Sequence, residues 1–146
     1  MLALLQRVRQ ARVEVDGAVV GAIGQGLRVL VCAEPADTPA SAARLVDKLL
    51  RLRVFADHAG KMNHSVQDLA GGLLIVSQFT LAADTSGGNR PSFTGAAGAE
   101  QGRRLYEHAL THERRLHAEV QCGEFGADMQ VSLVNDGPVT IPLRMT

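Results

Sequence analysis

The chain has 146 residues, of which 46% are hydrophobic, so it is long enough for one buried core and too short for two ordinary domains. Its fifteen Lys and Arg residues balance fifteen Asp and Glu residues, which excludes a surface that coats nucleic acid through many phosphate contacts. We therefore expect a single domain over residues 1–146 with no affinity for DNA as a polymer. Thirteen of the basic residues are arginine, which leaves room for one local phosphate site, although a GC-rich genome explains the same bias equally well.

The N-terminal third is predicted to consist of strands. Residues 2–9 and 11–15 alternate between apolar and polar side chains, and Asp16-Gly17 indicates a hairpin before the strand AVVGAI. The run LRVLVCA, residues 27–33, is typical of a buried strand. The glycines of GAIGQG, residues 21–26, precede this strand instead of following one, so they predict a turn and no phosphate-binding loop.

The remainder of the chain mixes two helices with further strands. Thr38-Pro39 fits an N-cap followed by proline at the first helical position. The predicted elements are a helix with Leu45, Val46, Leu49 and Leu50 on one face, a short strand at 53–55, an apolar strand at 71–81, a Gly/Pro-rich loop at 82–95, a helix near 97–117, and strands near 128–134 and 139–144.

About eight strands clustered around two helices indicate an α+β domain with a largely antiparallel or mixed sheet. Cys32 and Cys122 lie on separate elements, so we expect both to be reduced. No run of 18 apolar residues predicts a membrane span, and the apolar run at the N-terminus is too short for a targeting peptide. We therefore expect a soluble, cytoplasmic protein.

His108 and His112 stand four residues apart on the second predicted helix, a spacing that two metal ligands use. The glutamate that follows the first histidine in a zincin is missing, and the neighbouring polar residues indicate a solvated helix face. We predict no metal and no other cofactor.

Polar residues interrupt the most apolar strand at its end, in the segment VSQFTLAADT. Gln78 and Thr80 share one face of a strand and Ser77 points to the other. Buried hydroxyl and amide groups need partners, so the cluster is either a satisfied hydrogen-bond network or a functional site, and the residues alone do not decide between them. No Ser-His-Asp set accompanies Ser77, which leaves a hydrolase with a side-chain nucleophile unsupported.

The segment NDGPVT, residues 135–140, interrupts a second alternating pattern with Gly137-Pro138. Proline donates nothing to a ladder and glycine weakens a strand, so the pair argues against a continuous strand. A hairpin turn between the two last strands is the ordinary interpretation.

Three separated stretches resemble one family, the D-aminoacyl-tRNA deacylases. They are SQFTLAADT with NRPSF, GKMN at residues 60–63, and FGADMQVSLVNDGPVT at residues 125–140. The opening strands are similar as well, so the resemblance covers nearly the whole chain. Cys32-Ala33, where the family commonly has Gly-Val, and His64, where an aliphatic residue is more usual, depart from the pattern outside its two specific motifs.

The resemblance implies a barrel-like α+β fold and an enzyme that hydrolyses the ester between a D-amino acid and the terminal adenosine of tRNA. It implies a homodimer with active sites at the interface, where each subunit inserts a cis Gly137-Pro138 peptide into its partner's site. The catalytic element carried over is Ser77, Gln78, Phe79 and Thr80, and the residues that receive the adenosine are Phe125, Gly126 and Met129.

A rigid backbone wall could hold the α-amino group of the substrate and leave no room for an L side chain, while a D side chain points away. Such a wall would also accept glycine, so glycyl-tRNA mischarged on tRNA(Ala) is an expected substrate.

An aminoacyl ester is already activated, so a positioned water and an oxyanion hole of backbone N–H groups near Phe79 and Thr80 would suffice, with assistance from the ribose 2′-hydroxyl that the family implies. Thr80 and Gln78 are interpreted as orienting groups in preference to Thr80 as a nucleophile, because no base lies near it in the sequence. Arg7 and Arg9, on one strand face, are candidates to hold the acceptor end.

Two alternatives stay open. The scaffold could serve a noncatalytic module that binds RNA ends, or a metal-free esterase that acts on small substrates. The sequence does not specify the preferred D-amino acid or the set of tRNAs.

Overall fold

A computed structural model describes all 146 residues as eight strands, two α-helices and one short 3₁₀ helix. The strands are β1 (Leu2–Val15), β2 (Ala18–Ile23), β3 (Gly26–Cys32), β4 (Phe55–Ala56), β5 (Met62–His64), β6 (Gly72–Ser77), β7 (Val120–Cys122) and β8 (Gln130–Arg144). The helices are α1 (Pro39–Arg51), the 3₁₀ helix η1 (Phe79–Ala82) and α2 (Ala99–Leu116). The predicted α+β class is confirmed.

Six strands form one mixed sheet, in the order β2-β1-β3-β6-β7, with β8 paired to β1. β1 pairs antiparallel with β2, β3 and β8, whereas β3 with β6 and β6 with β7 are parallel. The strand β1 holds three partners because its first half, from Leu2, pairs with β3 and its second half, from Ala11, pairs with β2. β4 and β5 form a separate small hairpin.

The main sheet curls until its two ends nearly meet, as the family resemblance implies. A Cβ atom at Gly21 of β2 would lie 2.5 Å from the carbonyl oxygen of Cys122 in β7, so the two strands pass at a distance that only glycine permits. The curl divides the apolar residues into two groups. One core of 22 buried residues lies between the sheet and the helices, and a second core of six lies inside the curl.

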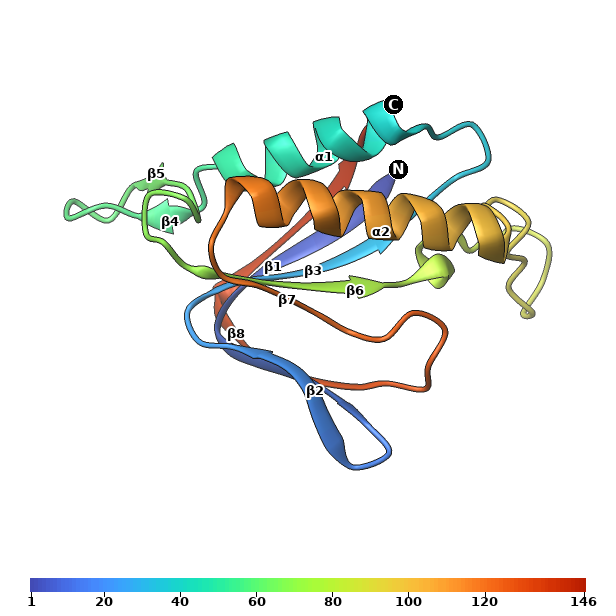
Figure 1. The fold of residues 1–146 in the computed structure, drawn as a ribbon, viewed down its shortest axis with the longest axis horizontal. Coiled ribbons are helices and arrows are strands. Elements are labelled where there is room, and N and C mark those ends of the chain that lie inside the picture. Colours follow the sequence, from blue (N-terminus) through green and yellow to red (C-terminus); the bar gives the residue numbers. More distant parts are fainter.

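Helices α1 and α2 lie side by side on one face of the sheet, with the β4–β5 hairpin beyond one end and the loop that precedes α2 at the other (Figure 1). Thr38 caps α1 as predicted, because its side chain accepts from the backbone of Ser41 and the Ser41 side chain accepts from the Thr38 backbone. The buried face of α1 includes the predicted Leu45, Val46, Leu49 and Leu50. Neither α-helix combines the length and apolar character that a membrane span requires.

The strand predicted at residues 71–81 is shorter than expected. β6 ends at Ser77, whose partner is Val31 of β3, and the Gln78 N–H makes one last bond of 2.8 Å to the Val31 carbonyl. Beyond Cys32 the strand β3 ends, so the chain after Gln78 has no ladder to join and turns into η1.

The prediction of two strands separated by a hairpin turn at Gly137-Pro138 is wrong. β8 is one strand that runs antiparallel to β1 throughout, with Asn135 opposite Val8 and Thr140 opposite Gln6. Residues 136–139 therefore bulge out opposite Arg7, and the ladder resumes on both sides. We call these four residues the Gly-Pro loop.

Candidate active site

A cavity of about 510 Å³ opens where β3 and β6 end, beneath the first half of α2. Met1 and four segments contribute to it, within residues 31–33, 76–79, 97–106 and 125–131, and 13 of the 19 lining residues are hydrophobic. An apolar cavity with a few polar groups is the usual form of a site for a small organic group.

The cavity brings together two of the three groups of predicted site residues. The predicted residues that line it are Ser77, Gln78, Phe79, Phe125, Gly126 and Met129. Thr80, Gly137 and Pro138 are not among the lining residues of this chain.

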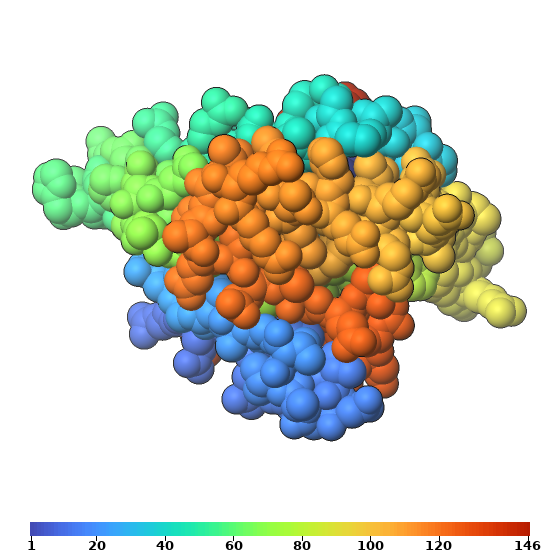
Figure 2. All heavy atoms as spheres, viewed as in Figure 1, coloured from blue at the N-terminus to red at the C-terminus, as the bar shows by residue number.

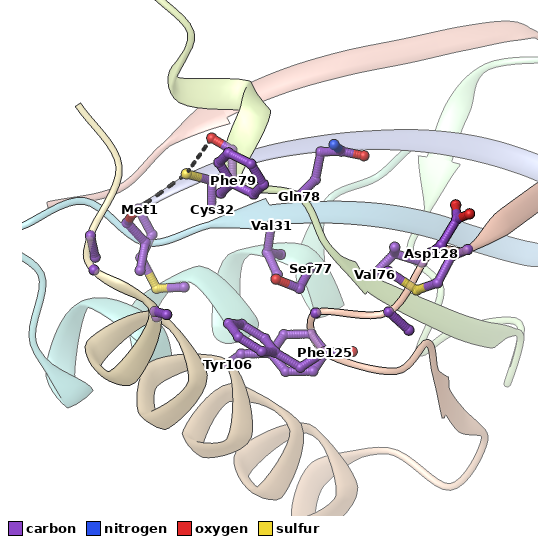
Figure 3. Close-up of a pocket in the computed structure, with 18 of the residues that line it drawn as sticks. Met1, Val31, Cys32, Val76, Ser77, Gln78, Phe79, Tyr106, Phe125 and Asp128 are labelled. Atoms are coloured by element: carbon purple, nitrogen blue, oxygen red, sulfur yellow. Dashed lines mark hydrogen bonds between the residues drawn. The ribbon is translucent and has the colours of Figure 1, made fainter. Parts of the chain in front are cut away.

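The strand end directs Ser77 and Gln78 to opposite sides. Ser77 lies on the side of Tyr106 and Phe125, while the Gln78 side chain extends away from them (Figure 3). The Gln78 amide donates to the Thr80 hydroxyl, so these two side chains form the local network that the sequence left open, and Ser77 faces the cavity. Phe79 packs edge-on against Phe93 with ring centroids 5.2 Å apart, which ties η1 to the loop before α2.

Aromatic rings form the wall of the cavity opposite Ser77. The rings of Tyr106 and Phe125 have centroids 5.8 Å apart, and the Tyr106 hydroxyl donates to the carbonyl oxygen of Ile75 at 2.9 Å. Burial raises the pKa of the Tyr106 hydroxyl, so the phenol stays neutral and serves as an apolar wall. Flat rings beside Met129 suit a planar base or ring.

The cavity lining holds no nucleophilic side chain that is paired with a base. Burial is the main cause that raises the pKa of the Cys32 thiol, which donates toward the Phe79 carbonyl oxygen at 3.5 Å and stays protonated. No histidine lines the cavity, so Ser77 lacks the partner that would activate it. Asp128 is the one carboxylate of the lining, and its oxygens point away from Tyr106 and Phe125 (Figure 3). The lining therefore favours attack by a water over attack by a side chain.

Gly137 and Pro138 are exposed at the tip of the Gly-Pro loop, and the peptide bond between them is cis. Gly137 has φ +128, and a Cβ atom there would lie 2.8 Å from Nη2 of Arg7. Arg7 donates from Nε to the Asp136 carbonyl at 3.0 Å and from Nη1 to the Val54 carbonyl at 2.7 Å. Side chains of the flanking sheet thus fix the backbone of a loop whose own side chains are small.

Asn135 completes this support from the other side. Its Nδ2 atom donates to the carbonyl oxygens of Arg7 and Val139, at 2.9 and 3.0 Å, and bridges the base of the loop. The Arg7 guanidinium is thus engaged within the chain, with 14% of the side chain exposed, whereas 76% of the Arg9 side chain is exposed. Of the two arginines predicted to hold an acceptor end, Arg9 is the exposed one, and its single ion-pair contact is with Asp136 at 3.5 Å.

His108 and His112 of α2 point to different neighbours and form no metal site with a third ligand. His112 Nε2 lies 3.1 Å from Asp47 Oδ1 on α1, and His108 lines a separate depression with Arg104. No group of three or more His, Cys, Asp or Glu side chains is placed to hold a metal ion. That the chain works without metal or cofactor stays a prediction.

The sequence did not predict four residues that lie in or beside the cavity. They are Cys32, Tyr106, Asp128, and Arg103, whose guanidinium carbon lies 4.7 Å from the Phe125 ring centroid. Only Tyr106 carried a usable signal, as the single tyrosine of the chain on the apolar face of a helix.

Residues 4–144 match the family model described as D-Tyr-tRNA(Tyr) deacylase. The chain belongs to this family. A D-aminoacyl-tRNA deacylase of Paracidovorax citrulli is 70% identical over 145 residues, covering 99% of the chain and 94% of the relative. Another, of Methylibium petroleiphilum, is 73% identical over 143 residues, covering 98% and 94%.

Solved structures agree with the family at the level of the fold. The structure of a protein named c-Myc DNA Unwinding Element Binding Protein superposes with a TM-score of 0.94 at 42% identity. The match covers 99% of this chain and 98% of the c-Myc DNA Unwinding Element Binding Protein. A probable eukaryotic D-amino acid tRNA deacylase superposes with a TM-score of 0.86 at 17% identity, with 97% of both chains covered, which shows a shared fold alone.

Proposed function

We propose that this chain hydrolyses the ester bond between a D-amino acid and the 3′-terminal adenosine of tRNA, releasing the free D-amino acid and tRNA. One observation carries the proposal: a single apolar cavity joins Ser77–Phe79 to Phe125–Met129, the two segments expected to receive the ester and the adenosine. Close relatives named D-aminoacyl-tRNA deacylase support the same activity.

The chemistry assigned to the cavity is attack by a positioned water. Helices leave their first N–H groups without partners inside the helix, and Phe79 and Thr80 occupy the first two positions of η1. These N–H groups could stabilise the oxyanion that forms as water adds to the ester carbon. Thr80 acts as an orienting group, because its hydroxyl accepts from the amide of Gln78, which lines the cavity, while Thr80 itself does not line it. An acyl group trapped on Thr80 would contradict this role.

The chiral selection is assigned to the Gly-Pro loop of a second subunit. Supporting this, the loop lies outside the cavity of its own chain, exposes Gly137 and Pro138, and is held by hydrogen bonds from Arg7 and Asn135. Inserted into a partner's cavity, its backbone would bind the α-amino group and fill the space of an L side chain. Contact through backbone tolerates many D side chains and also glycine.

The proposal is tested by the hydrolysis rates of D-alanyl-, glycyl- and L-alanyl-tRNA by the same preparation. Steric exclusion predicts that the D and glycyl esters react while the L ester is slower by roughly a hundredfold or more. A site that recognises the D side chain itself would instead fail on glycyl-tRNA, since the missing group contributes nothing.

The same preparation separates the two alternatives. Binding of tRNA ends without hydrolysis of any ester would indicate a noncatalytic module on this scaffold, in keeping with the structural neighbour that is named as a DNA-binding protein. Equal turnover of free D-amino acid esters and D-aminoacyl-tRNA would indicate a small-molecule esterase.

A further inference from the structure

Arg103 projects from the first half of α2 onto the ring of Phe125, at the surface where α2 meets the loop of residues 123–129. Its guanidinium carbon lies 4.7 Å from the ring centroid, within the range of a cation–π contact. Figure 2 shows the gold and orange surface of α2 beside the red-orange surface of that loop. Because Phe125 is itself a wall of the cavity, the contact fixes a positive charge at the edge of the site.

The N–H donors of Arg103 remain largely available. Its one ion-pair partner is Glu107, with Nη1 and Oε1 3.9 Å apart, which is too long for a hydrogen bond, and 54% of the side chain is exposed. Stacking restricts the guanidinium without using its donors, so little conformational freedom is lost when an anion binds. A planar group of free N–H donors beside a nucleoside cavity matches a phosphate.

The distribution of charge supports an anion on this side of the molecule. Helices α1 and α2 together hold seven basic residues against four acidic ones, a formal charge of +3. The whole chain balances at zero, so the remaining residues carry −3. The helical layer is therefore the part of the chain whose formal charge favours the approach of a polyanion.

We propose that Arg103 binds the phosphate on the 5′ side of the nucleoside that occupies the cavity. This inference rests on the proposed function, because a terminal adenosine seated beside Phe125 is what places a phosphodiester at the cavity edge. Arg103 is then a substrate-binding residue that holds the first backbone group outside the cavity. Arg104, next in sequence, lines a different depression with Asp37 and His108 and provides a matched control.

The direct test compares the affinities of adenosine and adenosine 5′-monophosphate for the wild-type protein and for Arg103→Gln and Arg104→Gln. We expect the wild type to bind the monophosphate roughly tenfold more tightly, the Arg103 variant to lose this difference, and the Arg104 variant to retain it. Hydrolysis of D-aminoacyl-tRNA gives a second measure. The slope of log kcat/KM against log salt is negative, and in the Arg103 variant it should become less steep by about 0.7, the value for one phosphate contact on a single strand.

Two results would overturn the inference. Equal weakening of adenosine and monophosphate by Arg103→Gln would mean that Arg103 only supports the packing of Phe125. Equal effects of the two arginine variants would mean that the attraction is diffuse. Since the affinity ratio needs no turnover, a protein that binds the monophosphate through Arg103 but hydrolyses no ester would contradict the proposed function and leave this inference standing.

Discussion

Glu113 on α2 is the one acidic residue in the buried set, with 1% of its surface exposed, and its Oε2 atom has no hydrogen-bond partner. Burial raises the pKa of its carboxyl group to about 8, and the nearby Arg114 offsets only part of this effect. The group therefore carries a proton at neutral pH and packs in the core as a neutral side chain. A single residue thus makes the stability of the helical layer sensitive to pH, without lining the cavity.

The sign of this sensitivity follows from the two pKa values. The folded-state pKa of about 8 lies above the reference value of 4.5, so the stabilisation is fully present below pH 4.5 and is lost as the pH rises toward 8. We expect Glu113→Gln to remove this loss, on the order of a few kcal/mol, and to have a higher melting temperature than wild type at pH 8.5. Thermal unfolding from pH 5 to 9 measures this change in stability, with Glu100→Gln, at an exposed position of the same helix, as the control. Parallel wild-type and Glu113→Gln profiles would show that the carboxyl group is already ionised in the folded protein.

At the scale of elements, β8 departs most from what its sequence indicates. Gly137 and Pro138 argue locally for a break, yet the strand continues because Asn135 and Thr140 both pair with β1. Arg7 occupies the gap in the ladder and binds the loop from a position 129 residues away in the sequence. A tertiary contact of this kind leaves no periodic signal near the residues it stabilises.

Elements whose limits are set by neighbouring residues in the sequence were predictable, and those set by distant strands were not. Helix α1 followed from local chemistry, a Thr38 cap and an apolar face, and both are present. The end of β6 depends on where its neighbour β3 ends, which no local pattern records. The contact of Arg103 with Phe125 also joins distant segments, so the family motifs marked the cavity wall but not the charge beside it.

Arg7 and Arg9 offer a matched pair to test how the Gly-Pro loop is held. Both contact Asp136, but only Arg7 also donates to backbone carbonyls, and lysine cannot reproduce its planar pair of donors. We expect Arg7→Lys to lower kcat/KM on D-aminoacyl-tRNA by about tenfold or more, because the loop loses charge-assisted hydrogen bonds. Arg9→Lys should stay close to wild type, because lysine keeps the positive charge at this exposed position. Discrimination between D and L esters should fall with Arg7→Lys while its circular dichroism stays native. Unchanged discrimination would show that the loop keeps its shape without the guanidinium.

For the whole molecule, the cavity and the Gly-Pro loop are separate features of one chain. The cavity lies under the first half of α2, and no residue of the loop lines it. The proposed two-fold dimer would bring the two features together, since a contact that placed one loop in the partner's cavity would also place the second loop in the first cavity. Each complete site would then draw its cavity from one subunit and its chiral wall from the other.

This arrangement predicts recovery of activity when two defective chains are mixed. Phe125→Ala damages the cavity, and Gly137→Ala damages the loop, because a Cβ atom there meets Arg7 at a positive φ that favours glycine. Each variant alone should be nearly inactive on D-aminoacyl-tRNA.

After denaturation and refolding together in equal amounts, about half of the dimers are mixed, and each mixed dimer holds one site built from an intact cavity and an intact loop. About a quarter of all sites should then be intact, and the mixture should recover roughly that fraction of wild-type activity. If each chain completed its own site, every site would keep one defect and mixing would restore nothing.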